Sequence, residues 1–227
     1  MKILFCAATE MELSSTFPNV SPFDSIKLGQ ALSGPRGDYL VHGVGVGETT
    51  LHLTKHLSHN SEYDCIIQVG VCGLYPQAAR IQQIYVTEVV HVVQEAFGDL
   101  GAETPDGFIP MSLLLPDYYV EVTPPLMMPA LTGSLLEFIP KLEFIPKVNG
   151  LTVSNITGTQ KTALERESLF HAEVESMEGA AAARAAQEFQ IPFLQIRSIS
   201  NLASTRDQSS WKIREALSSL KEFFENV

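Results

Sequence analysis

The sequence predicts a three-layer α/β sandwich in which helices flank a mixed, mostly parallel central sheet. Two observations predict this fold class. Continuous apolar runs, typical of strands covered on both faces, alternate along the chain with segments of helical character. The 227 residues are 45% hydrophobic and 18% charged, which is typical of a folded globular protein. No compositional boundary divides the chain, so we expect a single domain over residues 1–227.

Six segments have the character of strands. The first is an apolar run with few charges, and the second runs into a glycine-rich turn. The third ends in small residues, and the fourth is rich in Val and Ile. In chain order the expected strands are Lys2–Ala8, Asp38–Thr50, Asp64–Gly73, Gln83–Val93, Val148–Thr159 and Ile191–Ser200.

Three segments favour helices. Thr49–Leu57 contains no helix breaker, and Met177–Gln190 has an alanine-rich face narrow enough to pack closely on a sheet. From Ser209, the expected cap, apolar residues recur at helical spacing up to Val227. The stretch Phe97–Pro129 carries many Pro and Gly residues, so we expect loops and short elements there.

A tandem repeat, LEFIPKLEFIPK, occupies Leu136–Lys147. Its two prolines interrupt any long helix, and one hexamer repeated once is too short for a solenoid. We interpret it as a locally duplicated surface segment.

The charge balance excludes several classes of protein. Fifteen Lys+Arg against 26 Asp+Glu give a net charge of −11, which disfavours duplex nucleic acid and anionic membranes as partners. No stretch approaches the roughly 18 apolar residues of a membrane span, and the N-terminus lacks the layout of a signal peptide. Three scattered cysteines, Cys6, Cys65 and Cys72, favour buried free thiols. We expect a soluble cytoplasmic protein.

Four segments place polar or small residues at the ends of predicted strands, where ligands bind in open α/β sheets. Each segment also has a purely structural interpretation, as an acidic first turn of a helix or as a glycine turn. The glycine-rich GVGVG run lacks the Lys-Ser/Thr of a phosphate loop. The four segments are Ala8–Leu13, Gly70–Gly73, Val174–Ala183 and Ser198–Asn201, the last followed by a polar stretch to Trp211.

Taken in this order, MKILFCAATEMEL, QVGVCG, VESMEG and IRSISN resemble the motifs of the nucleoside phosphorylase and nucleosidase superfamily. Two longer stretches, EAFGDLGAETPDGF and SISNLASTRDQSSWKIREAL, resemble its futalosine hydrolase branch. The resemblance covers nearly the whole chain except the tandem repeat. It implies the fold of the nucleoside phosphorylases, a purine nucleoside substrate and a homodimer.

The resemblance also implies cleavage of a ribose–purine N-glycosidic bond, which breaks through an oxocarbenium-like transition state. By position in its motif, Glu12 is similar to the family's water-activating carboxylate. Glu178 is similar to the acid that binds the ribose hydroxyls, and Met177 would pack against the sugar. Val71, Cys72 and Gly73 would line the water side.

Asn201 is the most informative position for the leaving group. Relatives that cleave methylthioadenosine carry Asp here, which donates a proton to purine N7. An amide instead accepts from a protonated N7 through its oxygen and donates to a purine O6 through its NH₂. This favours a 6-oxopurine, hypoxanthine. Asp207 is a candidate for the missing acid, or else belongs to a loop that enters the last helix.

Two positions, Lys161 and Thr162, match the purine-contacting residues of the relatives, although a Lys at 161 does not favour ring stacking. Futalosine-type substrates also carry a benzoate, which requires a cation. The candidates for that cation are Lys161, Arg166, Arg206 and Lys212.

Hydrolysis is favoured over phosphorolysis. Up to residue 80 the only arginines are Arg36 and Arg80, outside the site motifs, and Glu12 would repel phosphate. No metal or organic cofactor is expected, since the histidines show no ligand spacing beyond His52 and His56 at i,i+4. Two alternatives stay open: a methylthioadenosine/adenosylhomocysteine or 6-amino-6-deoxyfutalosine nucleosidase, and a non-catalytic nucleoside-binding protein.

Overall fold

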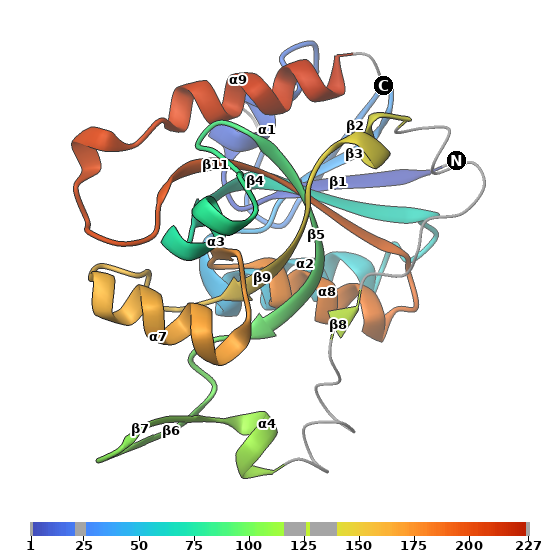
Figure 1. Cartoon of the computed structure of the whole chain (residues 1–227). Helices are drawn as coiled ribbons and strands as arrows, with labels where there is room; N and C mark the ends of the chain where they lie inside the picture. Colours follow the sequence, from blue (N-terminus) through green and yellow to red (C-terminus); the bar gives the residue numbers. More distant parts are fainter. Residues whose placement is uncertain (1, 21–25, 116–125, 128–139, 226–227) are drawn as a thin grey trace.

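The computed structural model describes residues 2–20, 26–115, 126–127 and 140–225 (Figure 1). Nine strands of the described chain form one sheet, in the order β10-β9-β5-β11-β4-β1-β3-β2, with β8 paired to β5. The strands are β1 (Ile3–Ala7), β2 (Ala31–Gly34), β3 (Gly37–Val41), β4 (Cys65–Leu74), β5 (Val89–Phe97), β8 (Leu126–Met127), β9 (Lys147–Thr152), β10 (Val174–Ser176) and β11 (Phe193–Leu202).

The sheet is mixed, as predicted. Strands β3, β1, β4 and β11 run parallel, whereas β5 is antiparallel to β11. Strand β10 pairs with β9 on one side and with the end of β4 on the other. The sheet therefore closes into a ring of five strands, β4-β11-β5-β9-β10, and the carboxyl end of β4 lies inside this closure.

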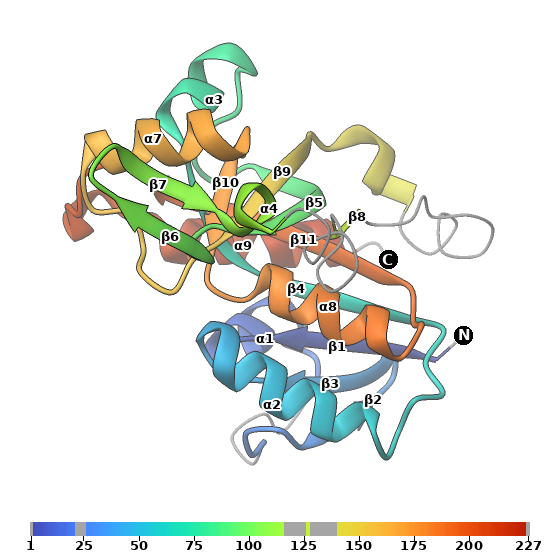
Figure 2. The same ribbon diagram turned by 90° about the horizontal axis from the view of Figure 1, so that it is seen from below.

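Helices cover both faces, which confirms the predicted three layers (Figures 1 and 2). Helices α1 and α9 lie together on one face, and α2 and α8 lie side by side on the other. The described helices are α1 (Glu10–Thr16), α2 (Gly45–Leu57), α3 (Pro76–Ile81), α4 (Met111–Leu114), α7 (Gln160–Phe170), α8 (Gly179–Glu188) and α9 (Ile213–Phe224), with short 3₁₀ turns η2 (Pro140–Phe144) and η3 (Gln208–Ser210). None of these helices could span a membrane.

The two faces are packed differently. Under α1 and α9 the core contains an aromatic cluster. The rings of Phe5 and Phe17 contact each other and the rings of Tyr39 and Phe224, with centroid distances of 6.2 Å or less. Under α2 and α8 the core is mostly aliphatic, and the alanine run of α8 is buried against the sheet. Small side chains let α8 approach the sheet closely, as the alanine-rich face predicted.

Several predicted boundaries are wrong for physical reasons. The strand expected from Gln83 begins at Val89, because Gln83 and Thr87 adopt positive φ angles of 55° and 80° that interrupt a strand. Helix α2 starts at Gly45, inside the GVGVG run, and the last helix starts at Ile213, since Ser209 lies in η3. Helices α1 and α7 and strand β10 were not among the predicted elements.

The tandem repeat is only partly a surface segment. Residues 136–139 lie outside the described residues. In the second copy Leu142 is buried in the core under α9 and Ile145 packs against the same cluster, whereas Phe144 is 86% exposed. A hairpin of β6 (Gly101–Thr104) and β7 (Gly107–Pro110), followed by α4, projects away from the sheet (Figure 1).

Candidate active site

A pocket of about 250 Å³ lies at the carboxyl ends of β1, β4, β10 and β11. Ligands of open α/β sheets bind at this edge, because the loops that leave parallel strands converge there. The lining residues are Ala8, Thr9, Met11, Glu12, Val44, Val71, Cys72, Gly73, Ile156, Thr157, Glu175, Ser176, Met177, Glu178, Ser200, Asn201, Trp211 and Ile213.

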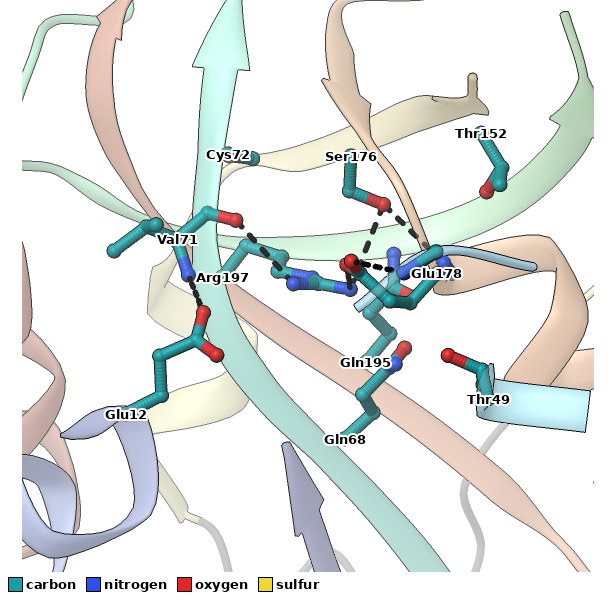
Figure 3. Close-up of polar contacts among 12 residues, drawn as sticks. Glu12, Thr49, Gln68, Val71, Cys72, Thr152, Ser176, Glu178, Gln195 and Arg197 are labelled. Carbon is teal, nitrogen blue, oxygen red and sulfur yellow. Dashed lines mark hydrogen bonds and ion pairs between the residues drawn. The ribbon is translucent and has the colours of Figure 1, made fainter. Parts of the chain in front are cut away.

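Glu12 is held by its own helix. Thr9 caps α1, and its hydroxyl accepts a hydrogen bond from the Glu12 amide. The Glu12 Oε2 atom accepts from the Thr9 amide at 3.1 Å and from the Thr9 hydroxyl at 2.9 Å, which completes a capping box. The other oxygen, Oε1, accepts from the Val71 amide at 3.0 Å. Three donors therefore fix a buried carboxylate at the pocket wall, and Figure 3 shows the bond from Val71.

Gly70 leaves the space that the Glu12 carboxylate occupies. A Cβ atom at Gly70 would lie 2.5 Å from Glu12 Oε1 and 2.7 Å from Arg197 Nη1, closer than van der Waals contact permits. A glycine on β4 thus lets a carboxylate and a guanidinium approach the same point of the backbone.

Arg197 is the functional residue that the sequence analysis missed. It is 1% exposed, and its Nη1 donates to the Val71 carbonyl at 3.3 Å. Its Nη2 forms an ion pair of 3.7 Å with Glu178 and a hydrogen bond of 3.5 Å with Ser176 (Figure 3). The sequence did contain a signal, since an Arg inside a buried apolar strand requires partners.

Glu178 is the second buried carboxylate of the pocket. It is the N-cap residue of α8, yet its side chain makes no capping bond to that helix. Instead Oε1 accepts from the Gly45 amide at 3.1 Å, at the start of α2. Burial raises the pKa of Glu178, Arg197 opposes this shift, and the negative charge of Glu12 adds to it.

Asn201 lies at the far end of the pocket wall. It pairs in register with Gly73, and its Nδ2 would be 3.5 Å from a Cβ at that glycine. The Asn201 Oδ1 atom accepts from the Ser200 hydroxyl at 2.7 Å, and Nδ2 donates to the Leu202 carbonyl at 3.1 Å. An amide oxygen has a second lone pair and an NH₂ a second hydrogen, so both atoms can still bind a ligand.

Glu175 lines the pocket, but its oxygens are occupied. They accept from the Tyr75 hydroxyl at 2.8 Å and from the amide and hydroxyl of Thr157 at 2.9 and 2.5 Å. Arg166 lies 3.4 Å away and also donates to Thr157 at 2.8 Å. Glu175 therefore fixes the loop that carries Thr157 into the pocket.

The matches to known proteins agree with this arrangement. Residues 28–227 match the family described as the Phosphorylase superfamily. The futalosine hydrolase of Streptomyces coelicolor is 32% identical over 193 residues, which cover 82% of this chain and 75% of that protein. The chain belongs to the futalosine hydrolase family of the phosphorylase superfamily.

Solved structures resemble the fold of this futalosine hydrolase family member over nearly its whole length. The futalosine hydrolase of Helicobacter pylori strain 26695 has a TM-score of 0.73 and 16% identity, covering 99% of this chain and 96% of its own. The 5′-methylthioadenosine/S-adenosylhomocysteine nucleosidase of H. pylori, solved with butyl-thio-DADMe-Immucillin-A, has a TM-score of 0.71 and 17% identity, with coverages of 100% and 97%. At these identities the likeness concerns the fold.

Most of the residues expected from the resemblance meet in the pocket of this futalosine hydrolase family member. They are Glu12, Val71, Cys72, Gly73, Met177, Glu178 and Asn201. Burial raises the pKa of the Cys72 thiol to about 12, which disfavours a nucleophilic role.

Three expected residues, Lys161, Thr162 and Asp207, do not line this pocket, and their roles stay predictions. Lys161 and Thr162 belong to the first turn of α7, where the Lys161 side chain is 84% exposed beside Glu165 and the Thr162 amide binds the Thr159 cap. Ile156 and Thr157, just before that helix, line the pocket instead. Asp207 is exposed and caps η3 through Ser209, whose hydrogen bonds lower the pKa of Asp207. A lowered pKa is the opposite of what a proton donor needs.

The rim of the pocket is apolar. Met11, Val44, Trp211 and Ile213 line it, and Met11 and Val44 are more than half exposed. Among the cations proposed for a benzoate, Arg166 is occupied by Glu175 and Thr157. Lys212 lies between two rim residues, 3.6 Å from Glu215. Within the described residues, no group of three or more His, Cys, Asp and Glu could hold a metal ion.

Proposed function

We propose that this chain hydrolyses the N-glycosidic bond of futalosine, releasing hypoxanthine and dehypoxanthine futalosine in the futalosine route of menaquinone biosynthesis. The relative at 32% identity is a futalosine hydrolase. One observation in this molecule carries the proposal. Two buried carboxylates, Glu12 and Glu178, lie on either side of Arg197 in one pocket, with the Asn201 amide at its other end.

Glu12 activates the water. Its carboxylate accepts one proton from a water molecule while the water oxygen forms a bond to C1′ of the ribose. The bond between C1′ and N9 breaks, and its electron pair leaves with the purine. The departing purine takes one proton from solvent at N7, and Glu12 later returns the proton that it accepted to solvent, so that the net products are the free base and a sugar hydroxyl.

Glu178 and Arg197 act on the sugar side. Positive charge builds on the ribose as the glycosidic bond breaks, and a buried carboxylate stabilises that charge. Glu178 also accepts hydrogen bonds from the ribose hydroxyls. Arg197 keeps Glu178 ionised against the cost of burial, because it is the charge that opposes the rise in the Glu178 pKa.

Asn201 selects the base. The carboxylate site at Gly70 and the amide at Gly73 are three residues apart on β4, or about 10 Å at roughly 3.3 Å per residue. A purine and its C1′ fit between them. The Asn201 oxygen accepts from a protonated N7 while its NH₂ donates to O6, whereas a 6-amino group would face that NH₂ donor to donor. Such a buried mismatch costs about 1–3 kcal/mol.

Water is the nucleophile rather than phosphate. Arg197 and Glu12 both approach Gly70, and Glu178 and the Val71 carbonyl already occupy the Arg197 guanidinium. Arg36, just before the amino end of β3, is bound to the Phe224 carbonyl, and Arg80 is exposed on α3. A phosphate at this position would meet two carboxylates.

The apolar rim receives the aromatic tail of futalosine. Trp211 and Ile213 provide a flat apolar surface beside Met11 and Val44. Lys212, next to Trp211, pairs with the tail carboxylate in place of Glu215.

A substrate panel tests the proposal. The purified protein is incubated with futalosine, its 6-amino analogue, methylthioadenosine and inosine, with and without phosphate, and the free base is measured. We expect hypoxanthine from futalosine at the highest kcat/KM, with no requirement for phosphate. Faster release of adenine from the 6-amino analogue would contradict the role of Asn201, and a phosphate requirement would contradict hydrolysis. Binding without any release of base would favour a nucleoside-binding protein.

We also propose that the chain forms a homodimer. The exposed apolar side chains Leu113 and Leu115, on the arm that projects from the sheet, support a surface that is covered in solution. Light scattering on the purified protein tests this, and a mass near 24.9 kDa would contradict it.

A further inference from the structure

The first turn of α8 is capped by residues from two strands rather than by its own N-cap residue. The Gly179 amide donates to the Ser176 hydroxyl at 3.2 Å, and the Ala180 amide donates to the Thr152 hydroxyl at 2.7 Å. Glu178, at the N-cap position, makes no such bond. Its carboxylate turns instead toward Gly45 and Arg197 (Figure 3).

The Thr152 hydroxyl is oriented by a buried carboxylate, Glu95 on β5. Because Thr152 accepts from the Ala180 amide, its single hydrogen is free to be donated to Glu95 Oε2, 3.0 Å away. The other oxygen, Glu95 Oε1, accepts from Gln195 Nε2 at 2.7 Å. Both Glu95 and Thr152 are buried, so each of these bonds lies out of water.

Two glycines let Glu95 reach this position. A Cβ at Gly150 would lie 2.5 Å from Glu95 Oε1, and a Cβ at Gly179 would overlap the same oxygen. Glycine at both positions brings β5, β9 and the start of α8 together around one carboxylate. The pocket described above does not include Glu95 among its lining residues.

We infer that Glu95 and Thr152 are positioning residues, which cap α8 in place of Glu178 and so leave the Glu178 carboxylate available to the sugar. The side chain at an N-cap position commonly binds the amide two or three residues later, here that of Ala180 or Ala181, and a negative charge there is attracted to the helix terminus. Thr152 already binds the Ala180 amide and Ser176 the Gly179 amide, which weakens that attraction. The functional part of this inference rests on the proposed hydrolysis, whereas the capping part does not.

Two pairs of variants test the inference. Thr152→Val removes the hydroxyl at nearly constant volume, and Glu95→Ala removes the group that orients it. We expect each to lower kcat/KM for futalosine by about tenfold or more, with a raised KM, because Glu178 turns toward the unpaired Ala180 amide. Thr152→Ser restores the hydroxyl and most of the lost activity. Glu95→Gln also keeps the activity, since its oxygen can accept from Thr152. Its NH₂ can donate to Gln195 Oε1, now without a hydrogen-bond partner, once the Gln195 amide turns over.

Glu167→Gln is the matched control. Glu167 is another buried carboxylate that caps a helix, since it accepts from the Ala78 amide of α3 at 2.5 Å, but it lies outside the pocket. We expect this variant to lower Tm and to leave KM and kcat unchanged.

Crystal structures of wild type and Thr152→Val decide the capping part without reference to any substrate. A Glu178 carboxylate rotated onto the α8 amides in the variant supports the inference, and one still bound to Gly45 and Arg197 overturns it. A rotated carboxylate with unchanged KM and kcat overturns the functional part. If the wild-type protein releases no hypoxanthine from futalosine, the proposed function fails, and the structures still decide the capping.

Discussion

The two carboxylates of the pocket are held in contrasting ways. Glu12 is fixed mainly by Thr9, three residues earlier in the chain, through a capping box at the start of its own helix. Glu178 also stands at the start of a helix, but its position depends on Gly45, Arg197 and the Thr152 hydroxyl, which come from distant parts of the chain. One carboxylate is thus positioned by local sequence, and the other by the assembled sheet.

The largest effect is expected from Glu12→Gln. Glutamine keeps the shape and can still complete the capping box, so α1 should remain folded. It cannot take a proton from water, and we expect kcat for futalosine to fall by at least about 10²-fold with little change in KM. Steady-state kinetics of hypoxanthine release measure both constants.

Glu10→Gln is the control for that variant. Glu10 is exposed in the same turn of α1, where it contacts none of the pocket groups named above. Its kcat should equal that of the wild type. Near-normal turnover by Glu12→Gln would remove Glu12 from the mechanism. The carboxylate that is positioned by local sequence would then have no function in the reaction.

Glu178→Ala should cost at least about 10²-fold in kcat/KM, but with a different signature. Because the proposed mechanism has Glu178 bind the ribose in the ground state as well as in the transition state, we expect KM to rise and kcat to fall together. The variant also leaves Arg197 buried without its ion-pair partner, which should lower Tm. A change in Tm with unaltered kinetic constants would make Glu178 a purely structural residue.

Glu95 predicts a pH dependence of stability on the α8 side. Burial raises the pKa of Glu95 from 4.5 to about 7; Gln195, Arg197 and Thr152 oppose the rise, and Glu178 adds to it. Below pH 4.5 the folded and unfolded chains both hold the proton, and this contribution to stability is complete. As the pH rises toward 7 only the unfolded chain loses its proton, so the free energy of unfolding falls by on the order of 3 kcal/mol.

Urea unfolding at pH 5 and pH 8 measures this contribution when wild type is compared with Glu95→Gln. Glutamine does not titrate, so the variant should lose less stability between the two pH values than wild type does. Equal losses in the two proteins would show that Glu95 keeps one charge state across this range. The capping role of Glu95 depends on hydrogen bonds and would be unaffected by that result.

The contrast between the two carboxylates also explains what the sequence could predict. The alternation of apolar strands and helices was enough for the layers and the mixed sheet, because it depends on periodicity alone. The T-x-x-E pattern at Thr9 and Glu12 predicts a helix start by itself, although α1 was not among the expected elements. Most of the expected pocket residues lie at strand ends, and the fold brings them together there.

The residues that were missed depend on register. Gln195 and Gln68 are paired on β11 and β4, and Arg197 lies two residues further along β11, opposite Gly70. In the sequence each looks like an isolated polar residue in an apolar strand. Only strand pairing shows that Arg197 meets Glu178 and that Glu95 meets Gln195 and Thr152. Asp207 shows the reverse case, since it lies near a motif along the chain but does not line the pocket.

The smallest effect is expected from Thr9→Ala, which tests whether the local cap positions Glu12. The change removes the cap of α1 and one of the three donors to Glu12. Loss of an N-cap hydroxyl costs about 1 kcal/mol of stability, which chemical denaturation can measure. Glu12 keeps its bonds to the Thr9 backbone amide and to Val71, which a side-chain truncation does not remove, so kcat should fall far less than in Glu12→Gln. A loss of kcat as large as that of Glu12→Gln would mean that the cap, rather than the β4 backbone, determines where this carboxylate points.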